Sequence, residues 1–263
     1  MFIDTHVHLN NTILYEKIDQ VINEAKEAKV TEFIVVGYDL ETSKKAIEIA
    51  EKYECCYAVI GFHPTEIKDY TDKEYAWLDE NASRNKVIGI GEIGYDLHWD
   101  TTTLEEQEQA FIKQIKIALK HNLPVSIHTR DAIQKTYETL QKYGMKKLKG
   151  VIHSYSGSSE MAKEFIKLGF KLGISGPITF LNNRTMKETV ESVSLNDLIT
   201  ETDSPYLTPH PYRGKENGPK YIPLIVEKIA EIKDTNIEEV SKIIRENVKE
   251  LFNIWEKKFW VLY

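Results

Sequence analysis

The chain has 263 residues, of which 41% are hydrophobic and 29% are charged, a composition that is ordinary for a folded globular protein and argues against disorder. No apolar stretch is as long as a membrane span and no basic segment leads into an apolar run, so we expect neither a membrane span nor a secretory signal, and a cytoplasmic location is the default. The net charge of −7 disfavours a large basic surface that would grip duplex DNA, although a phosphate substrate held by metal ions is still possible.

Short apolar runs recur along the chain, with amphipathic stretches between them. The expected strands are residues 2–6, 33–37, 57–61, 87–91, 125–128, 150–153, 170–174 and 198–201. The expected helices are residues 14–28, 41–53, 72–83, 104–121, 131–143, 158–168, 182–193, 218–232 and 236–256. This alternation predicts an α/β fold, a (β/α)8 TIM barrel that forms a single domain over residues 1–263, and a doubly wound open sheet is the alternative.

Two features stand outside the alternating pattern. Cys55 and Cys56 are adjacent, which suits neither an ordinary disulfide nor a zinc site, so we expect both to be small buried residues. The C-terminal helix leads into an unusually aromatic tail, together about residues 236–263. The tail is expected either to fold back over the outer helices or to form a subunit contact, because a free apolar patch is a liability in a monomer.

Five of the eight histidines fall at or just after the ends of expected strands. They are His6, His8, His63, His128 and His153. Functional side chains of a barrel lie at the C-terminal ends of its strands, and Glu92 and Asp203 follow two further strands at that same end. Imidazole and carboxylate ligands that converge in this way form a site for Zn²⁺, Mn²⁺ or a similar ion, and the absence of cysteine ligands argues against a closed structural zinc site.

Each of these residues also has an ordinary structural explanation. Glu92 could pair with Arg130 at the end of a strand, and Asp203 could cap the chain before Pro205. His153 could be a buried imidazole bonded to a neighbouring hydroxyl. Their common placement at one end of the barrel favours a shared metal site over these separate explanations.

The motifs that contain these residues follow one another in a recognisable order. They are DTHVH at 4–8, GFHP at 61–64, GIGEIGYD at 89–96, PVSIHTR at 124–130, HSYSG at 153–157 and ETDSPYL at 201–207. In this order they resemble the TatD family of metal-dependent deoxyribonucleases, within the amidohydrolase-like superfamily, and the resemblance extends to NGP at 217–219. The departures are small: Tyr155 stands where the family often has Phe, and Ser204 where Ala or Ser is usual.

The resemblance implies a set of site residues and cofactors. It implies two divalent metal ions (Mg²⁺, Mn²⁺ or Zn²⁺), one held by His6, His8, Glu92 and Asp203 and the other by Glu92, His128 and His153. His63 and Arg130 become candidate phosphate or substrate contacts, and Tyr95, Asp96 and Glu201 become groups that orient the ligands. Four histidine ligands favour Mn²⁺ or Zn²⁺ over Mg²⁺. Related amidohydrolase barrels commonly carry a carbamylated Lys on the fourth strand, where this chain has Glu92.

The function implied is a metal-dependent deoxyribonuclease, expected to be an exonuclease that trims single-stranded or frayed DNA ends, with no membrane or obligate protein partner. Glu92 and Asp203 are the expected catalytic residues, Asp203 accepting or steering the proton of the attacking water. Candidate base-stacking aromatics are Phe62, Tyr95, Trp99 and Tyr206, and candidate phosphate-attracting cations are Arg130, Arg213, Lys215 and Lys220. One alternative is an ester or amide hydrolase such as a D-aminoacyl-tRNA deacylase, and another is a metal-binding scaffold without turnover.

Overall fold

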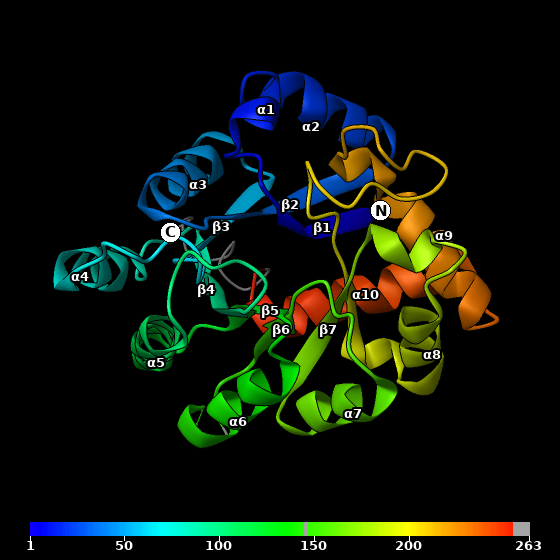
Figure 1. Cartoon of the computed structure of the whole chain (residues 1–263). Coiled ribbons are helices and arrows are strands. Elements are labelled where there is room, and N and C mark those ends of the chain that lie inside the picture. The colour runs from blue at the N-terminus through cyan, green and yellow to red at the C-terminus, as the bar shows by residue number, and fades with distance from the viewer. Residues whose placement is uncertain (145–146, 255–263) are drawn as a thin grey trace, which may run out of the picture.

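The computed structural model describes residues 1–144 and 147–254 and shows a closed barrel of eight parallel strands that neighbour one another in chain order (Figure 1). The strands are β1 (Phe2–Val7), β2 (Val30–Val36), β3 (Cys56–Ile60), β4 (Val87–Asp96), β5 (Val125–Arg130), β6 (Gly150–Ile152), β7 (Phe170–Ile174) and β8 (Leu198–Thr200). The barrel closes where Val7 forms a parallel bridge with Ser204, beyond β8, and the N–H of His8 donates to the Ser204 carbonyl at 3.0 Å. The TIM barrel is therefore confirmed, and the open sheet is excluded.

Most of the helices surround the strands on the outside of the barrel, whereas the last helix crosses behind the strands (Figure 1). They are α1 (Thr12–Tyr15), α2 (Ile18–Glu27), α3 (Leu40–Lys52), α4 (Asp72–Asn81), α5 (Leu104–His121), α6 (Ile133–Tyr143), α7 (Ser159–Lys167), α8 (Arg184–Ser192), α9 (Ile222–Ile232) and α10 (Ile237–Phe252), with short 3-10 turns η1 (Gly176–Thr179), η2 (Leu195–Asp197) and η3 (Pro219–Tyr221). The longest, α5, begins with a capping box in which Thr103 and Glu106 satisfy each other's backbone N–H groups, and it ends at Asn122 in the left-handed conformation. Its apolar face is buried against the barrel.

The fourth strand is longer than the sequence pattern predicts, and this matters for the site. It continues past Gly91 to Asp96, and its last four residues pair in parallel register with residues 127–130 of β5. Glycines at 89, 91 and 94 interrupt the apolar run, so the pattern of apolar residues does not predict this extension. Gly94 has a φ of +142°, and a Cβ there would collide with the carbonyl oxygen of His128, so the close approach of β4 and β5 requires glycine.

Two expected helices also differ from the structure. Residues 14–28 are divided into α1 and α2 because the backbone of Lys17 leaves the helical region, and the Lys17 side chain reaches Glu216 at 2.7 Å. Residues 218–232 begin as the 3-10 turn η3 before the α-helix starts at Ile222. These turns lie where the chain crosses from the mouth of the barrel to its outer layer.

The remaining expectations about the chain as a whole have mixed outcomes. Cys56 is buried as expected, whereas Cys55 is only partly buried, so the prediction is right for one cysteine and wrong for the other. The aromatic tail at 255–263 lies outside the described residues. Within the part of the chain that the structure describes, none of the helices has both the length and the apolar character that a membrane crossing needs.

Candidate metal centre

The end of β1 delivers two imidazoles to the mouth of the barrel. His6 is fully buried and His8 nearly so, and their Nε2 atoms are 3.3 Å apart. The Nδ1 atom of His8 is 2.9 Å from the Val36 carbonyl oxygen, which can only accept, so the ring proton stands on Nδ1 and Nε2 presents a lone pair when the ring is neutral. The Nδ1 atom of His6 lies 3.3 Å from Ser126 Oγ, and this contact orients the second ring.

Two carboxylates face the same pair of nitrogens. Asp203 Oδ1 is 3.3 Å from His8 Nε2 and 3.8 Å from His6 Nε2, while Glu92 Oε2 is 3.5 Å from His6 Nε2 and 3.9 Å from His8 Nε2. Two imidazole nitrogens and two carboxylate oxygens at this spacing are a donor set that suits a divalent ion such as Zn²⁺ or Mn²⁺. The residues present therefore fit a bound metal.

The second oxygen of Glu92 faces a different group of histidines. Glu92 Oε1 is 2.8 Å from His128 Nδ1 and 3.9 Å from the Nε2 atoms of both His63 and His153. One carboxylate thus has an oxygen in each of two neighbouring donor groups, which is the placement that a bridging ligand needs. Glu92 is itself only 4% exposed.

Among the described residues, three combinations of donor atoms are compact enough to share an ion, with all atoms of a group within 4.8 Å of one another. The groups are His6 with His8 and Asp203, His63 with Glu92 and His128, and His6 with His153 and Glu201. The first group contains three of the four residues that the resemblance implies for one ion. The second includes His63, which the sequence suggests only as a substrate contact, so His63 is also placed as a possible ligand.

Further carboxylates hold the outer side of these rings. Glu201 is fully buried and its Oε1 lies 2.8 Å from His153 Nδ1, while Asp96 Oδ2 lies 3.1 Å from His128 Nε2. Contacts of this kind fix the orientation of an imidazole and increase its basicity. Glu201 thus lies behind His153, and Asp96 behind His128.

The charges of the cluster determine its pKa values. Burial alone would lower the pKa of His153, but the charges of Glu201 and Asp203 raise it to about 10. Burial would likewise raise the pKa of Glu92, yet the hydrogen bond from His128 and the charge of His153 hold it well below its ordinary value. The pKa of His63 is lowered to about 3 by burial and by the neighbouring His128. Glu92 is thus kept ionised, as a carboxylate that holds a metal ion must be.

Asp4 is a buried group whose role the sequence analysis did not identify. Its carboxylate accepts from the Thr202 hydroxyl at 2.5 Å and from the Thr202 N–H at 3.0 Å, and it also accepts from the His6 N–H at 3.3 Å. Because it joins β1 to the residue before Asp203, it fixes the position of one proposed ligand relative to another. The sequence feature that could have pointed to this role is the position of Asp4, two residues before His6 in the first strand.

Tyr95 and Phe62 are not placed as the sequence suggests. The Tyr95 hydroxyl lies 3.0 Å from Thr139 Oγ1 and its ring packs edge-on against Phe111, so the side chain points into the outer layer, away from the cluster. Phe62 is 1% exposed and packs against two tyrosines. The suggestion that these two rings stack on bases is therefore wrong, because strand alternation and packing bury them.

Other candidate contacts lie at the rim of the mouth. Arg130 is exposed, with its guanidinium 5.7 Å from the centroid of the Trp99 ring, so it is not the partner of Glu92. Trp99 and Tyr206 are 56% and 53% exposed, and the Tyr206 ring centroid lies 6.3 Å from that of His8. These rings stand where a substrate would approach.

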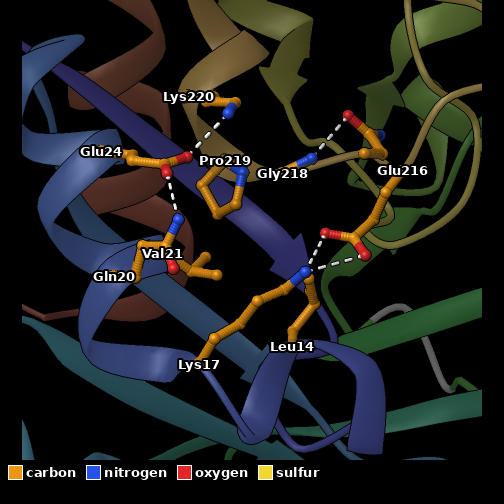
Figure 2. Close-up of a pocket in the computed structure, with 10 residues that line it drawn as sticks. Leu14, Lys17, Gln20, Val21, Glu24, Glu216, Gly218, Pro219 and Lys220 are labelled. Atoms are coloured by element: carbon orange, nitrogen blue, oxygen red, sulfur yellow. Dashed lines mark hydrogen bonds and ion pairs between the residues drawn. The ribbon is translucent and has the colours of Figure 1, made fainter.

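Lys220, Lys215 and Arg213 are the remaining cations that the sequence suggests for phosphate attraction. Figure 2 shows Lys220 directed to Glu24, at 2.7 Å, on the far side of a small hollow from the ion pair of Lys17 and Glu216. The hollow contains none of the clustered histidines. Arg213 lies over the Phe180 ring and Lys215 over the Tyr212 ring, at 4.5 and 5.6 Å from the ring centroids. Lys220 is thus engaged in an ion pair with Glu24.

Comparison with protein families matches residues 3–253 to the family described as TatD related DNase. The chain belongs to the TatD-related DNase family. It is 42% identical over 254 residues to the uncharacterized metal-dependent hydrolase YabD of Bacillus subtilis, covering 97% of this chain and 100% of that protein. It is 37% identical over 262 residues to the uncharacterized metal-dependent hydrolase MG009 of Mycoplasma genitalium, covering 95% of this chain and 98% of that protein.

A solved structure agrees with this family assignment. The crystal structure of YjjV, a TatD homologue from Escherichia coli, matches with a TM-score of 0.91 at 29% sequence identity and covers 96% of this chain and 98% of that one. The fold and the clustered His, Glu and Asp donors identify this TatD-family protein as a metal-dependent hydrolase. The donors lie at the C-terminal ends of the strands, where barrel enzymes carry their active sites.

Proposed function

We propose that this TatD-family hydrolase cleaves DNA phosphodiester bonds from strand ends with two divalent ions bound in the cluster. The observation that carries the proposal is the position of Glu92, whose two carboxylate oxygens face two separate donor groups. Adjacent ions in a shared site can stabilise both the attacking and the leaving oxygen of a phosphoryl transfer. The family description, TatD related DNase, supports a nucleic acid substrate.

In the proposed site, His6, His8, Glu92 and Asp203 hold one ion, and Glu92, His128 and His153 hold the other. The bound ions would lower the pKa of the attacking water towards ~7 and neutralise charge on the phosphoryl oxygens. Asp203 is 14% exposed at its side chain, more than Glu92 at 6%, so it can reach both the donor group and a solvent molecule. The charge of His153 lowers the pKa of Asp203 against the effect of burial, so the carboxylate is ionised and can orient the attacking water by accepting a hydrogen bond from it.

The rim of the mouth supports a single-stranded substrate. Trp99 and Tyr206 offer exposed ring faces on which unstacked bases can lie, and Arg130 beside Trp99 offers a cation to a phosphate. The net charge of −7 provides no general attraction for a duplex, so binding must depend on these local contacts and on the ions. We infer that His63, whose side chain is 14% exposed next to Glu92, contacts the scissile phosphate.

The test is a matrix of metals against substrates on the purified full-length protein. Metal-stripped protein is loaded with Mg²⁺, Mn²⁺ or Zn²⁺ and given linear single-stranded DNA, circular single-stranded DNA, duplex DNA, RNA and a D-aminoacyl-tRNA. We expect chelation to abolish activity and linear single strands to be shortened progressively, while circles of the same sequence persist. Cleavage of circles would overturn end-directed cleavage. Preference for the acyl ester would overturn phosphodiester hydrolysis while leaving the metal site intact.

A further inference from the structure

The loop that follows β8 carries two residues of the proposed site in one tight turn. Asp203 Oδ1 lies 3.3 Å from His8 Nε2, and the Tyr206 ring centroid lies 6.3 Å from that of the same histidine. The Tyr206 N–H donates to the Asp203 carbonyl at 2.9 Å, which closes the turn. Asp203 has a φ of +57°, in the left-handed region that residues with a side chain seldom adopt. Contacts from the surrounding structure must therefore hold the turn in this conformation.

A buried amide contacts both ends of this turn. Asn217 is 1% exposed, and its Nδ2 donates to the Thr202 carbonyl at 2.8 Å and to the Tyr206 carbonyl. Its Oδ1 accepts from the Gly218 N–H at 2.9 Å, and its backbone N–H donates to the Pro205 carbonyl at 3.2 Å. The side chain thus joins the residue before the turn to the last residue of the turn.

The segment that carries Asn217 is itself attached to α2. On one side of it Glu216 pairs with Lys17 at 2.7 Å, and on the other side Lys220 pairs with Glu24, also at 2.7 Å (Figure 2). Each exposed ion pair is weak by itself. Together they restrict both flanks of the segment, so the buried amide has a fixed base from which to hold the turn.

We propose that Asn217 is a positioning residue, whose amide fixes the Asp203 carboxylate in the metal centre by clamping the turn that ends at Tyr206. The inference rests on the proposed role of Asp203 as a metal ligand. An asparagine amide has two N–H donors, one for each carbonyl, and neither an alanine nor an ionised aspartate can replace them. Without these donors the turn would relax, and the carboxylate would lose its place beside His8 Nε2.

A second asparagine provides a matched control. Asn247 is 4% exposed, and its Nδ2 donates to the carbonyls of Leu195 and Leu198 at 2.8 and 2.7 Å. These carbonyls lie just before β8 and at its first residue, at the opposite end of the strand from Asp203. Replacing either asparagine removes two hydrogen bonds to backbone carbonyls. Of the two, only Asn217 lies beside a proposed ligand, so a purely structural effect should be common to both variants.

The first experiment titrates metal-stripped full-length protein with Zn²⁺ or Mn²⁺ in a calorimeter. Asn217→Ala should weaken metal binding about 10- to 100-fold, the range typical when a group that supports a ligand is lost. Asn247→Ala should bind metal as the parent does. Equal affinities in the parent and in Asn217→Ala, or equal losses in the two asparagine variants, would overturn the inference.

Asp203→Asn separates this inference from the proposed function on which it rests. We expect this variant to bind metal more weakly than the parent, and adding Asn217→Ala to it should cause little further loss, because the amide acts through that carboxylate. Losses that simply add would overturn the positioning role while leaving Asp203 as a ligand. An unchanged affinity in Asp203→Asn would overturn the proposed metal site at this residue, and the inference with it.

Two further measurements apply if Asn217→Ala is unstable. Asn217→Asp keeps the shape of the side chain but puts an oxygen in place of the donor, and it should also weaken metal binding; parent-like affinity would overturn the inference. The second measurement is the rise in melting temperature at a fixed excess of metal, which reports affinity for the folded state. This rise should be smaller in Asn217→Ala than in Asn247→Ala. Equal rises in the two variants would contradict the positioning role.

Discussion

The two ends of this barrel are built from opposite kinds of residue. At the C-terminal end, fully buried ionisable groups (Asp4, His6 and Glu201) surround the candidate metal centre. At the N-terminal end, the buried rings of Phe252 and Phe170 lie close against the glycines at 89 and 150. Burying charge is unfavourable unless it is paired, whereas burying apolar area is favourable. The comparison indicates that one end carries the chemistry and the other supplies stability.

The largest effect is expected from Glu92→Gln. An amide has one neutral oxygen and no anionic one, so it cannot offer an oxygen ligand to both donor groups. We expect metal-dependent turnover to fall by at least about 10³-fold, while the barrel still melts cooperatively. The check is initial rates together with circular dichroism. Glu250→Gln, an exposed carboxylate at the other end, is the control. Full activity in the Glu92→Gln variant would contradict the proposal that Glu92 bridges the two donor groups.

The next largest effect is expected from a change at the N-terminal end of the barrel. Phe170→Ala removes a buried ring that packs against Gly150, the first residue of β6. The substitution should lower the free energy of unfolding by about 3–5 kcal/mol. Urea denaturation measures this loss. We expect metal affinity and the kcat of the folded fraction to stay at the parent level. A comparable drop in kcat would show that the two ends are coupled and would break the comparison.

A smaller effect is expected from a change at Glu201, which lies behind the proposed ligand His153. Glu201→Gln keeps the shape of the side chain but removes the charge that holds His153 at 2.8 Å. Metal affinity should fall about 10- to 100-fold, which is typical when a partner of a ligating histidine is lost. Isothermal titration with Zn²⁺ or Mn²⁺ measures the change. If binding is instead abolished, Glu201 is a ligand, as its grouping with His6 and His153 would allow.

The smallest effect is expected at the rim. Trp99→Ala removes an exposed ring beside Arg130, and if a base stacks there the KM for single-stranded DNA should rise about 5- to 100-fold with little change in kcat. Trp99→Phe keeps an aromatic face and should retain most of the affinity. Equal behaviour of the alanine variant and the parent would place the substrate elsewhere.

Much of the fold could be predicted from the sequence because its signals are local. The eight apolar runs and the amphipathic stretches between them determine the order of strands and helices, and the barrel rule then places the five strand-end histidines at one end. The extension of β4 to Asp96 could not be predicted in this way. It depends on the close approach of β5, which the glycine at 94 permits and which no local pattern expresses.

The sequence by itself determined the barrel and which residue types gather at its mouth. Only the tertiary structure decided how they are used: that Glu92 presents one oxygen to each donor group, that Glu201 holds His153, and that Tyr95 points away from the cluster. The physical reason is that strand order follows from hydrophobic periodicity along the chain. The direction of each side chain, by contrast, follows from packing and hydrogen bonds between segments as far apart as Asp4 and Thr202.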